Sequence, residues 1–203
     1  MWQALHDELA PHGFTLVSVA IDTAESAGPW LEAVGPRHPA LIDADHRLAD
    51  VYRIVNVPTS VWIDEQGRIV RPNDAAFGSD QFLDFHGIPS APHREGLRAW
   101  VCEGRLPLAG DDAVRAHQVL PTPAEQLART EYALAWWLSC RGRAEAAERH
   151  FVHAGELAPH DFTIRRGSLP IRGKDPMGAD AADLFSDWIA AGRPYYPPMQ
   201  AKT

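Results

Sequence analysis

The chain has 203 residues, of which 45% are hydrophobic and 23% charged, and its net charge is −8. This composition is that of an ordinary globular protein of one or two domains, and it excludes a disordered tail, a collagen-like chain and a disulfide-rich scaffold. The acidic balance and the lack of a basic stripe argue against a nucleic-acid partner. No apolar run approaches the roughly 20 residues of a membrane helix. We therefore expect a cytoplasmic protein with neither a nucleic-acid nor a membrane partner.

Helical and strand patterns alternate in the first half of the chain. The predicted elements are a helix over 1–9, a strand over 14–21, a helix over 27–34, a strand over 40–42, a helix over 48–54, and a hairpin of strands 59–64 and 68–70. The strand over 14–21 is apolar on both alternating faces, which is typical of a strand buried on both sides in a parallel sheet. This order predicts an α/β fold with one central sheet.

The second half of the chain is mostly helical in pattern. Residues 73–92 are rich in Gly, Pro, Asp and Ser and predict an irregular excursion with a short helix at 80–85. Helices are predicted over 93–103, 125–140, 143–157 and 179–191, and an irregular loop over 161–176. We therefore divide the chain into an α/β domain, residues 1–104, and an all-α helical region, residues 105–203.

One segment carries a family resemblance. Val55 to Val70 reads VNVPTSVWIDEQGRIV and resembles the proline loop and terminal hairpin of the thioredoxin superfamily, closest to its TlpA/ResA group. Phe14–Asp22 resembles that group's central strand, and Leu41–Ile54 resembles the strand and helix that lead into the loop. The resemblance covers roughly residues 1–104 and implies a thioredoxin-like sheet flanked by helices.

The resemblance also implies a binding site at Val57, Pro58 and Thr59. Pro58 matches the family's cis proline, and the residue before it, Val57, would offer its backbone to an extended substrate. A cis bond before proline is uncommon in folded proteins and marks a tight turn. A trans proline that opens an ordinary strand is the alternative.

The reactive cysteine pair of the family is missing from this sequence. In the family a Cys-x-x-Cys opens the helix after the first central strand, and Met1 to Leu9 resembles only the later part of that helix. Either the scaffold has lost its active site, or Met1 is internal to a longer frame, as a recoded selenocysteine codon read as a stop would produce. We expect a protein of the thiol–disulfide oxidoreductase lineage that is redox-inactive as given and has no cofactor. The alternative is a non-catalytic module that binds a protein or peptide through the proline loop or a helical hairpin.

The two cysteines of the chain do not replace that pair. Cys102 and Cys140 are far apart in the sequence, and neither follows a strand, so neither opens a helix N-terminus as reactive thiols do. Each lies in an apolar helical pattern, which predicts a buried, inert thiol. A regulatory disulfide between them is the alternative.

The segment from Glu131 to Pro159 resembles one tetratricopeptide unit. The matching positions are Leu134, Ala135, Leu138, Gly142, Ala147, Phe151, Ala154 and Pro159. One unit is weakly specific, because repeats normally need about three copies to be stable. A generic helical pair is the alternative.

Histidines and apolar residues suggest two further hypotheses. His150, His153 and His160 form the best histidine cluster, but no cysteine or paired His-Glu motif completes a zinc site, so we expect no metal.

Loss of the first strand would uncover an apolar face near Met1, Trp2 and Leu16. Because such faces mark interfaces, we expect a protein or peptide partner, or a homodimer through the N-terminal edge.

Overall fold

The protein is described by a computed structural model that covers residues 1–192 and 195–196. It is a mixed α/β structure, mostly helical, with two small sheets and a C-terminal helical region. The chain divides into two units: residues 1–52 and 58–118 form the first, and residues 53–57 together with the described residues from 119 onward form the second. Within these residues no helix is both long and apolar enough to cross a membrane.

The first unit holds four strands in two separate pairs. Strand β1 (Ser18–Ala20) runs parallel to β2 (Ala40–Ile42), with Ser18 opposite Ala40. Strand β3 (Thr59–Ile63) runs antiparallel to β4 (Ile69–Ala75), as the hairpin pattern predicts. The expectation of one central sheet is corrected, because the described strands form two sheets of two strands each and β1 is not hydrogen-bonded to β3.

Six α-helices and one short 3₁₀ helix surround these strands. They are α1 (Trp2–Leu9), η1 (Ala10–His12), α2 (Ala24–Val34), α3 (Arg47–Val51), α4 (Leu83–His86), α5 (Ser90–Glu103) and α6 (Asp111–His117). The hydroxyl of Thr23 caps α2 by accepting from the Ser26 N–H, and Gly35 ends it with a left-handed φ of 55°. Two features differ from the sequence analysis: β4 extends into the predicted excursion, and α6 was not expected.

Helix α1 connects the two strand pairs. Its Leu5 and Leu9 are buried with Trp62 of β3 and Leu97 of α5. On its other side the Leu16 N–H, just before β1, donates to His6 Nδ1 over 3.4 Å, and the Arg37 N–H, before β2, donates to Gln3 Oε1 over 2.7 Å. One helix therefore packs on β3 and is hydrogen-bonded to the residues that lead into β1 and β2.

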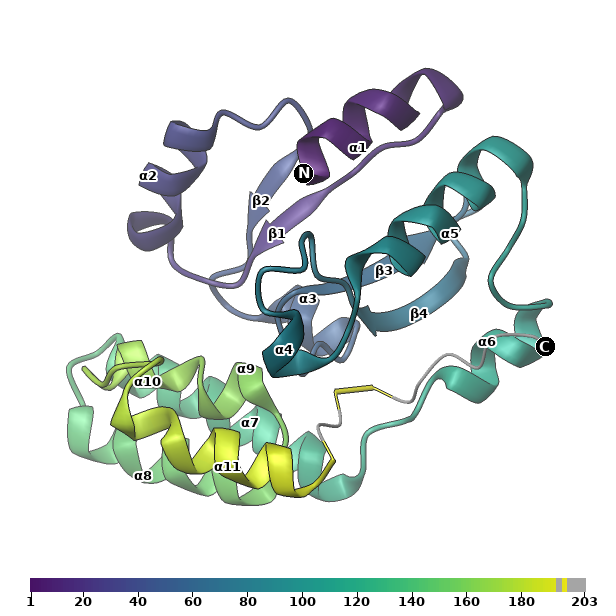
Figure 1. The fold of residues 1–203 in the computed structure, drawn as a ribbon. Helices are drawn as coiled ribbons and strands as arrows, with labels where there is room; N and C mark the ends of the chain where they lie inside the picture. The colour runs from purple at the N-terminus through teal and green to yellow at the C-terminus, as the bar shows by residue number, and fades with distance from the viewer. Residues whose placement is uncertain (193–194, 197–203) are drawn as a thin grey trace. The chain divides into compact units, whose positions relative to one another are not determined.

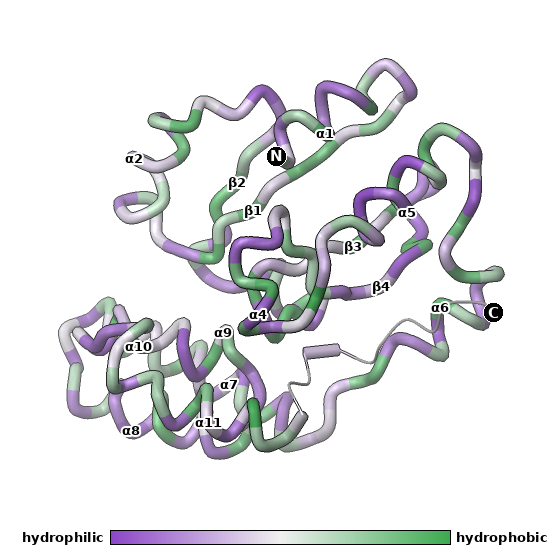
Figure 2. Tube along the Cα trace, in the orientation of Figure 1, coloured by the Kyte–Doolittle hydropathy of each residue, from purple (hydrophilic) through white to green (hydrophobic). Residues whose placement is uncertain are grey.

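The β1 region is not buried as predicted. None of residues 14–21 is fully buried, so the expectation of a strand covered on both faces is wrong. Val17 is 49% exposed and Leu41 of β2 50%, while α2 buries only Ala27 and leaves Trp30 76% exposed. The physical reason is that β1 has a strand on one side only and α2 turns its large apolar side chains to solvent. Figure 2 shows the hydrophobic character of β1 and β2.

The second unit is an assembly of helices. They are α7 (Pro123–Ser139), α8 (Ala144–Leu157), α9 (Phe162–Arg165), α10 (Ser168–Ile171), η2 (Ala179–Ala181) and α11 (Ala182–Ala190). Thr122 and Glu125 form a reciprocal capping box at the start of α7. The loop predicted over 161–176 is wrong, because Asp161 caps α9 and the apolar side chains of Phe162, Ile164 and Leu169 are buried.

Helices α7 and α8 form the hairpin that the sequence predicts. Their shared core contains Ala135, Ala147, Phe151 and Ala154, all buried, and Leu138 packs against it. Gly142 adopts a φ of 70° in the turn between the two helices. Leu134 departs from the pattern, since it is 41% exposed.

Candidate functional site

The proline loop lies where the chain passes from the second unit to the first. Val57 is the last residue of the segment 53–57, and its side chain is 55% exposed. Pro58 begins the next stretch, and its carbonyl accepts a hydrogen bond from the Ala76 N–H over 3.2 Å. Thr59 is the first residue of β3, opposite Ala75. The hairpin thus fixes Pro58 and Thr59, while the structure gives Val57 no hydrogen-bond partner among the described residues.

The segment before Val57 is held firmly inside the second unit. The Ile54 carbonyl accepts from Arg129 Nη2 over 2.6 Å and from Thr163 Oγ1 over 3.1 Å, and the Val55 carbonyl accepts from the Phe162 N–H over 2.8 Å. Arg129 also pairs with Asp161. The residues that precede Val57 are therefore held by hydrogen bonds within the second unit.

The Arg129–Asp161 pair is almost completely enclosed. Its side chains are 16% and 7% exposed, and Asp161 also accepts from the hydroxyl of Thr163 and the N–H of Ile164. Burial raises the pKa of the Asp161 carboxyl, and the Arg129 guanidinium opposes this shift. Such an enclosed pair specifies one arrangement of its backbone partners, because a carboxylate left without its arginine would be costly there.

Next to the loop, β3 carries a cluster of aromatic and polar side chains. Trp62 is 4% exposed and stacks on Trp100 of α5 with ring centroids 5.3 Å apart. The guanidinium of Arg71 lies 4.8 Å from the centre of the Trp62 ring, and Arg71 forms an ion pair with Asp74. This cluster packs β3 and β4 against α5.

His93 of α5 is the residue of this cluster whose pKa is shifted. It is 6% exposed, makes edge contacts with Trp2 and Trp62, and lies with Nε2 3.3 Å from Ser60 Oγ. Burial, assisted by the positive charge of Arg71, lowers the pKa of His93 to about 4, so that the ring is neutral at physiological pH.

The Ser60–His93 pair lacks the other parts of a hydrolytic site. A serine nucleophile needs a base that a third group orients. Here His93 Nδ1 is buried without a hydrogen-bond partner among the described residues, so no carboxylate orients the ring. The pair positions the start of β3, two residues after Pro58. The sequence analysis missed this pair; the shared helical face of His93, Leu97 and Trp100 could have indicated that His93 is buried, but not its partner Ser60.

Both cysteines are exposed and free, which corrects the expectation of buried thiols. Cys102 lies five positions after the buried Leu97, and Cys140 five positions after the buried Ala135. Five residues turn a helix by about 140°, which carries the side chain away from the buried face. Apolar neighbours in the sequence therefore did not indicate burial.

The histidine cluster has a different geometry from the one considered in the sequence. His150 and His153 of α8 both face Glu131 of α7, with His153 Nδ1 3.6 Å from Glu131 Oε1. The described residues include no group of three His, Cys, Asp or Glu side chains placed to hold a metal ion. Glu131 was missed as a partner because it belongs to the neighbouring helix.

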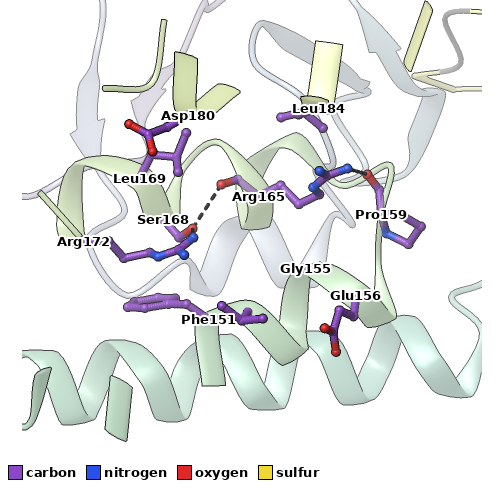
Figure 3. Close-up of a pocket in the computed structure, with 11 residues that line it drawn as sticks. Phe151, Gly155, Glu156, Pro159, Arg165, Ser168, Leu169, Arg172, Asp180 and Leu184 are labelled. Carbon is purple, nitrogen blue, oxygen red and sulfur yellow. Dashed lines mark hydrogen bonds between the residues drawn. The ribbon is translucent and has the colours of Figure 1, made fainter. Parts of the chain in front are cut away.

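The second unit also contains a pocket of about 360 Å³ (Figure 3). Arg165 and Arg172 line it, together with Ser168, Phe151 and Leu184. Both arginines already have partners: Arg172 holds both oxygens of Glu148 at 2.6 Å, and Arg165 donates to the Pro159 carbonyl and to Asp187. The guanidinium groups of both arginines therefore already form hydrogen bonds and ion pairs within the protein.

Searches against protein-family models, curated proteins and solved structures found no match for this chain.

Proposed function

We propose that the chain is a thioredoxin-like protein of the thiol–disulfide oxidoreductase lineage that has no dithiol chemistry of its own and binds an extended peptide at Val57, Pro58 and Thr59. The observation that carries this proposal is the exposed Val57, which has no hydrogen-bond partner among the described residues although both flanking segments are fixed. A backbone N–H and C=O presented in this way suit an extended peptide.

The arrangement of strands supports the thioredoxin-like assignment. A parallel pair, β1 and β2, is followed by an antiparallel hairpin, β3 and β4, and the proline stands directly before β3. This is the element order that the resemblance of residues 1–104 implies.

The positions of the thiols support the lack of exchange activity. Cys102 is the penultimate residue of α5, and Cys140 follows the last residue of α7, so both lie at helix C-termini. Reactive thiols instead open helices, and dithiol exchange needs a second thiol within reach to resolve the mixed disulfide. An insulin-reduction assay with dithiothreitol should give the uncatalysed rate for the wild type and for the Cys102→Ser/Cys140→Ser variant. Catalysis that this double substitution abolishes would contradict the proposal.

Peptide binding can be tested at the loop itself. Reduced and alkylated insulin B chain, an extended peptide without free thiols, should shift the amide resonances of Val57, Thr59 and Ser60 in a labelled full-length chain. Val57→Gly keeps the N–H and should keep binding, whereas Val57→Pro removes it and should weaken binding by about tenfold, as expected for one lost hydrogen bond of about 1.4 kcal/mol. Equal binding by both variants, or no shift at these residues, would overturn the proposed site.

A further inference from the structure

Two histidines of the first unit meet between α1 and the residues that lead into β2. The rings of His6, in α1, and His38, two residues before β2, form an edge contact with centroids 5.7 Å apart. His6 Nδ1 accepts a hydrogen bond from the Leu16 N–H over 3.4 Å. His38 Nε2 lies 3.1 Å from the hydroxyl oxygen of Ser18, the first residue of β1. The two rings therefore link α1, which Figure 1 shows beside β1, to the β1–β2 pair.

The hydrogen bond to His6 requires a neutral ring. A backbone N–H only donates, so His6 Nδ1 accepts with its lone pair and the single ring proton lies on Nε2. A second proton would bind to Nδ1 and would point at the Leu16 N–H. Protonation of His6 therefore breaks one of the links between α1 and the chain that enters β1.

His38 is also placed to be neutral. Its Nδ1 is buried and has no hydrogen-bond partner among the described residues. A neutral ring can leave Nδ1 without a proton, whereas a charged ring carries an N–H there that no acceptor satisfies. Burial lowers the pKa of His38 below its ordinary value of 6.5, and the nearby His6 lowers it further. Protonation of His38 is therefore more favourable when the ring is released to solvent.

The charged groups beside the rings are a carboxylate and a guanidinium. Asp7 of α1 raises the pKa of His38 and partly opposes the effect of burial. The hydrogen bond from Arg37 holds the pKa of Asp7 below its ordinary value, so this ion pair persists in mild acid. The two side chains are 68% and 39% exposed, where an ion pair contributes little to stability. Strands β1 and β2 carry no titratable side chain, so the histidines are the groups of this contact that gain charge in mild acid.

We propose that His6 and His38 form a pH-sensitive joint, at which mild acid releases the β1–β2 pair from α1. Each ring gains a proton and loses its contact, and two positive rings side by side repel each other. The joint is therefore most stable above about pH 6.5 and weakens as the pH falls below that value. The opposite side of α1 stays in place, because Leu5 and Leu9 pack against Trp62 through apolar surface. This inference does not depend on the proposed peptide site.

The first test compares the full-length wild type with a variant whose joint does not titrate. In His6→Asn/His38→Gln each amide places a neutral polar group near the position of the nitrogen that it replaces. Amide hydrogen exchange is measured at pH 7 and pH 5, and each rate is divided by that of an unstructured peptide at the same pH. The protection of Leu16 should fall at least about tenfold more in the wild type than in this variant. His93 is present in both proteins, so its effect on stability cancels.

Two controls restrict the effect to the joint. The Asp64 amide, which donates to the Arg68 carbonyl in the β3–β4 hairpin, should show the same pH dependence in both proteins. His12→Gln removes an exposed histidine of η1 and should respond to acid as the wild type does. The proposal is overturned if Leu16 loses equal protection in the wild type and the double variant, if Asp64 follows Leu16, or if His12→Gln abolishes the response.

The second test follows the rings themselves and stands even if the double variant does not fold. Nitrogen chemical shifts of His6 in the wild type at neutral pH should show Nδ1 without a proton, and its protonation should coincide with the loss of Leu16 protection. The single variant His6→Asn should raise the pKa of His38, because the ring that lowers it is absent. A His38 pKa at or above 6.5 in the wild type, or protonation of both rings with Leu16 unchanged, would contradict the joint.

Discussion

The two units of the chain differ in how completely they bury their own apolar residues. In the helical unit Ala128, Ala135, Ile164 and Trp188 have no exposed surface. In the first unit the apolar strand β1 has no fully buried residue. Among the described residues, β1 is hydrogen-bonded only to β2, and β3 only to β4. An apolar segment therefore becomes part of a closed core only where its hydrogen-bonding edges and its apolar faces have neighbours.

The largest expected effect on stability is the contrast between a buried tryptophan of the second unit and an exposed tryptophan of the first. Trp188 is fully buried against Phe162, with ring centroids 5.7 Å apart, so Trp188→Ala should lower the free energy of unfolding by about 3–5 kcal/mol. Trp30 is 76% exposed, so the matched Trp30→Ala should change it by less than about 0.5 kcal/mol. Urea unfolding followed by circular dichroism measures both. Similar losses of unfolding free energy in the two variants would contradict the difference in burial between the two units.

The next effect compares a buried ion pair with an exposed one. Asp161→Asn removes the buried carboxylate charge that pairs with Arg129 and should lower the free energy of unfolding by about 3 kcal/mol. Glu8→Gln removes an ion pair with Arg98 whose side chains are 46% and 42% exposed, and should cost less than about 1 kcal/mol. The exchange rate of the Val55 amide should rise in the first variant only. If Asp161→Asn is as stable as Glu8→Gln, the anchoring of residues 53–57 by this pair is wrong.

The first unit should lose stability in mild acid through His93. Its pKa is lowered to about 4 in the fold, below the ordinary value of 6.5, so the unfolded chain binds the proton more tightly. The stabilisation is complete above about pH 6.5 and is lost as the pH falls toward 4, with about 2 kcal/mol lost at pH 5. His93→Phe should flatten this dependence between pH 7 and pH 5, measured by thermal unfolding. An unchanged slope would exclude His93 as its source.

The smallest effect concerns the two exposed cysteines. Cys102→Ser and Cys140→Ser should each change the free energy of unfolding by less than about 0.5 kcal/mol, since neither side chain lies in a core. Both thiols should react with a maleimide reagent in the folded protein without denaturant. A thiol that reacts only after unfolding would restore the original expectation of burial.

The sequence predicted the elements better than their surroundings. Helical spacing located α1, α2, α5, α7 and α8, and the turn at Gly67 located the hairpin. The short helices α9 and α10 were missed, because glycines, prolines and basic residues mask the buried Phe162 and Ile164. The sequence pattern over 14–21 shows that the side chains are apolar. Burial also requires neighbouring strands and helices, and the pattern does not predict whether these are present.

The candidate site was predicted only in part. Val57 to Thr59 came from the resemblance, whereas His93 and the Arg129–Asp161 pair came only from the structure. These contacts join residues that lie more than thirty positions apart, as the Ser60–His93 pair with a separation of 33 shows. Local periodicity carries no information on such pairs.

Amide hydrogen exchange of the free, full-length protein tests the central claim most directly. We predict fast exchange at Val19 and Val61, whose N–H groups face away from the paired strands, and slower exchange at Ser18, which donates to Pro39. The slowest exchange is expected at Ala135 and Ile164 in the closed helical core. Val19 and Val61 amides as strongly protected as that of Ala135 would contradict it, because the first unit would then be as closed as the second.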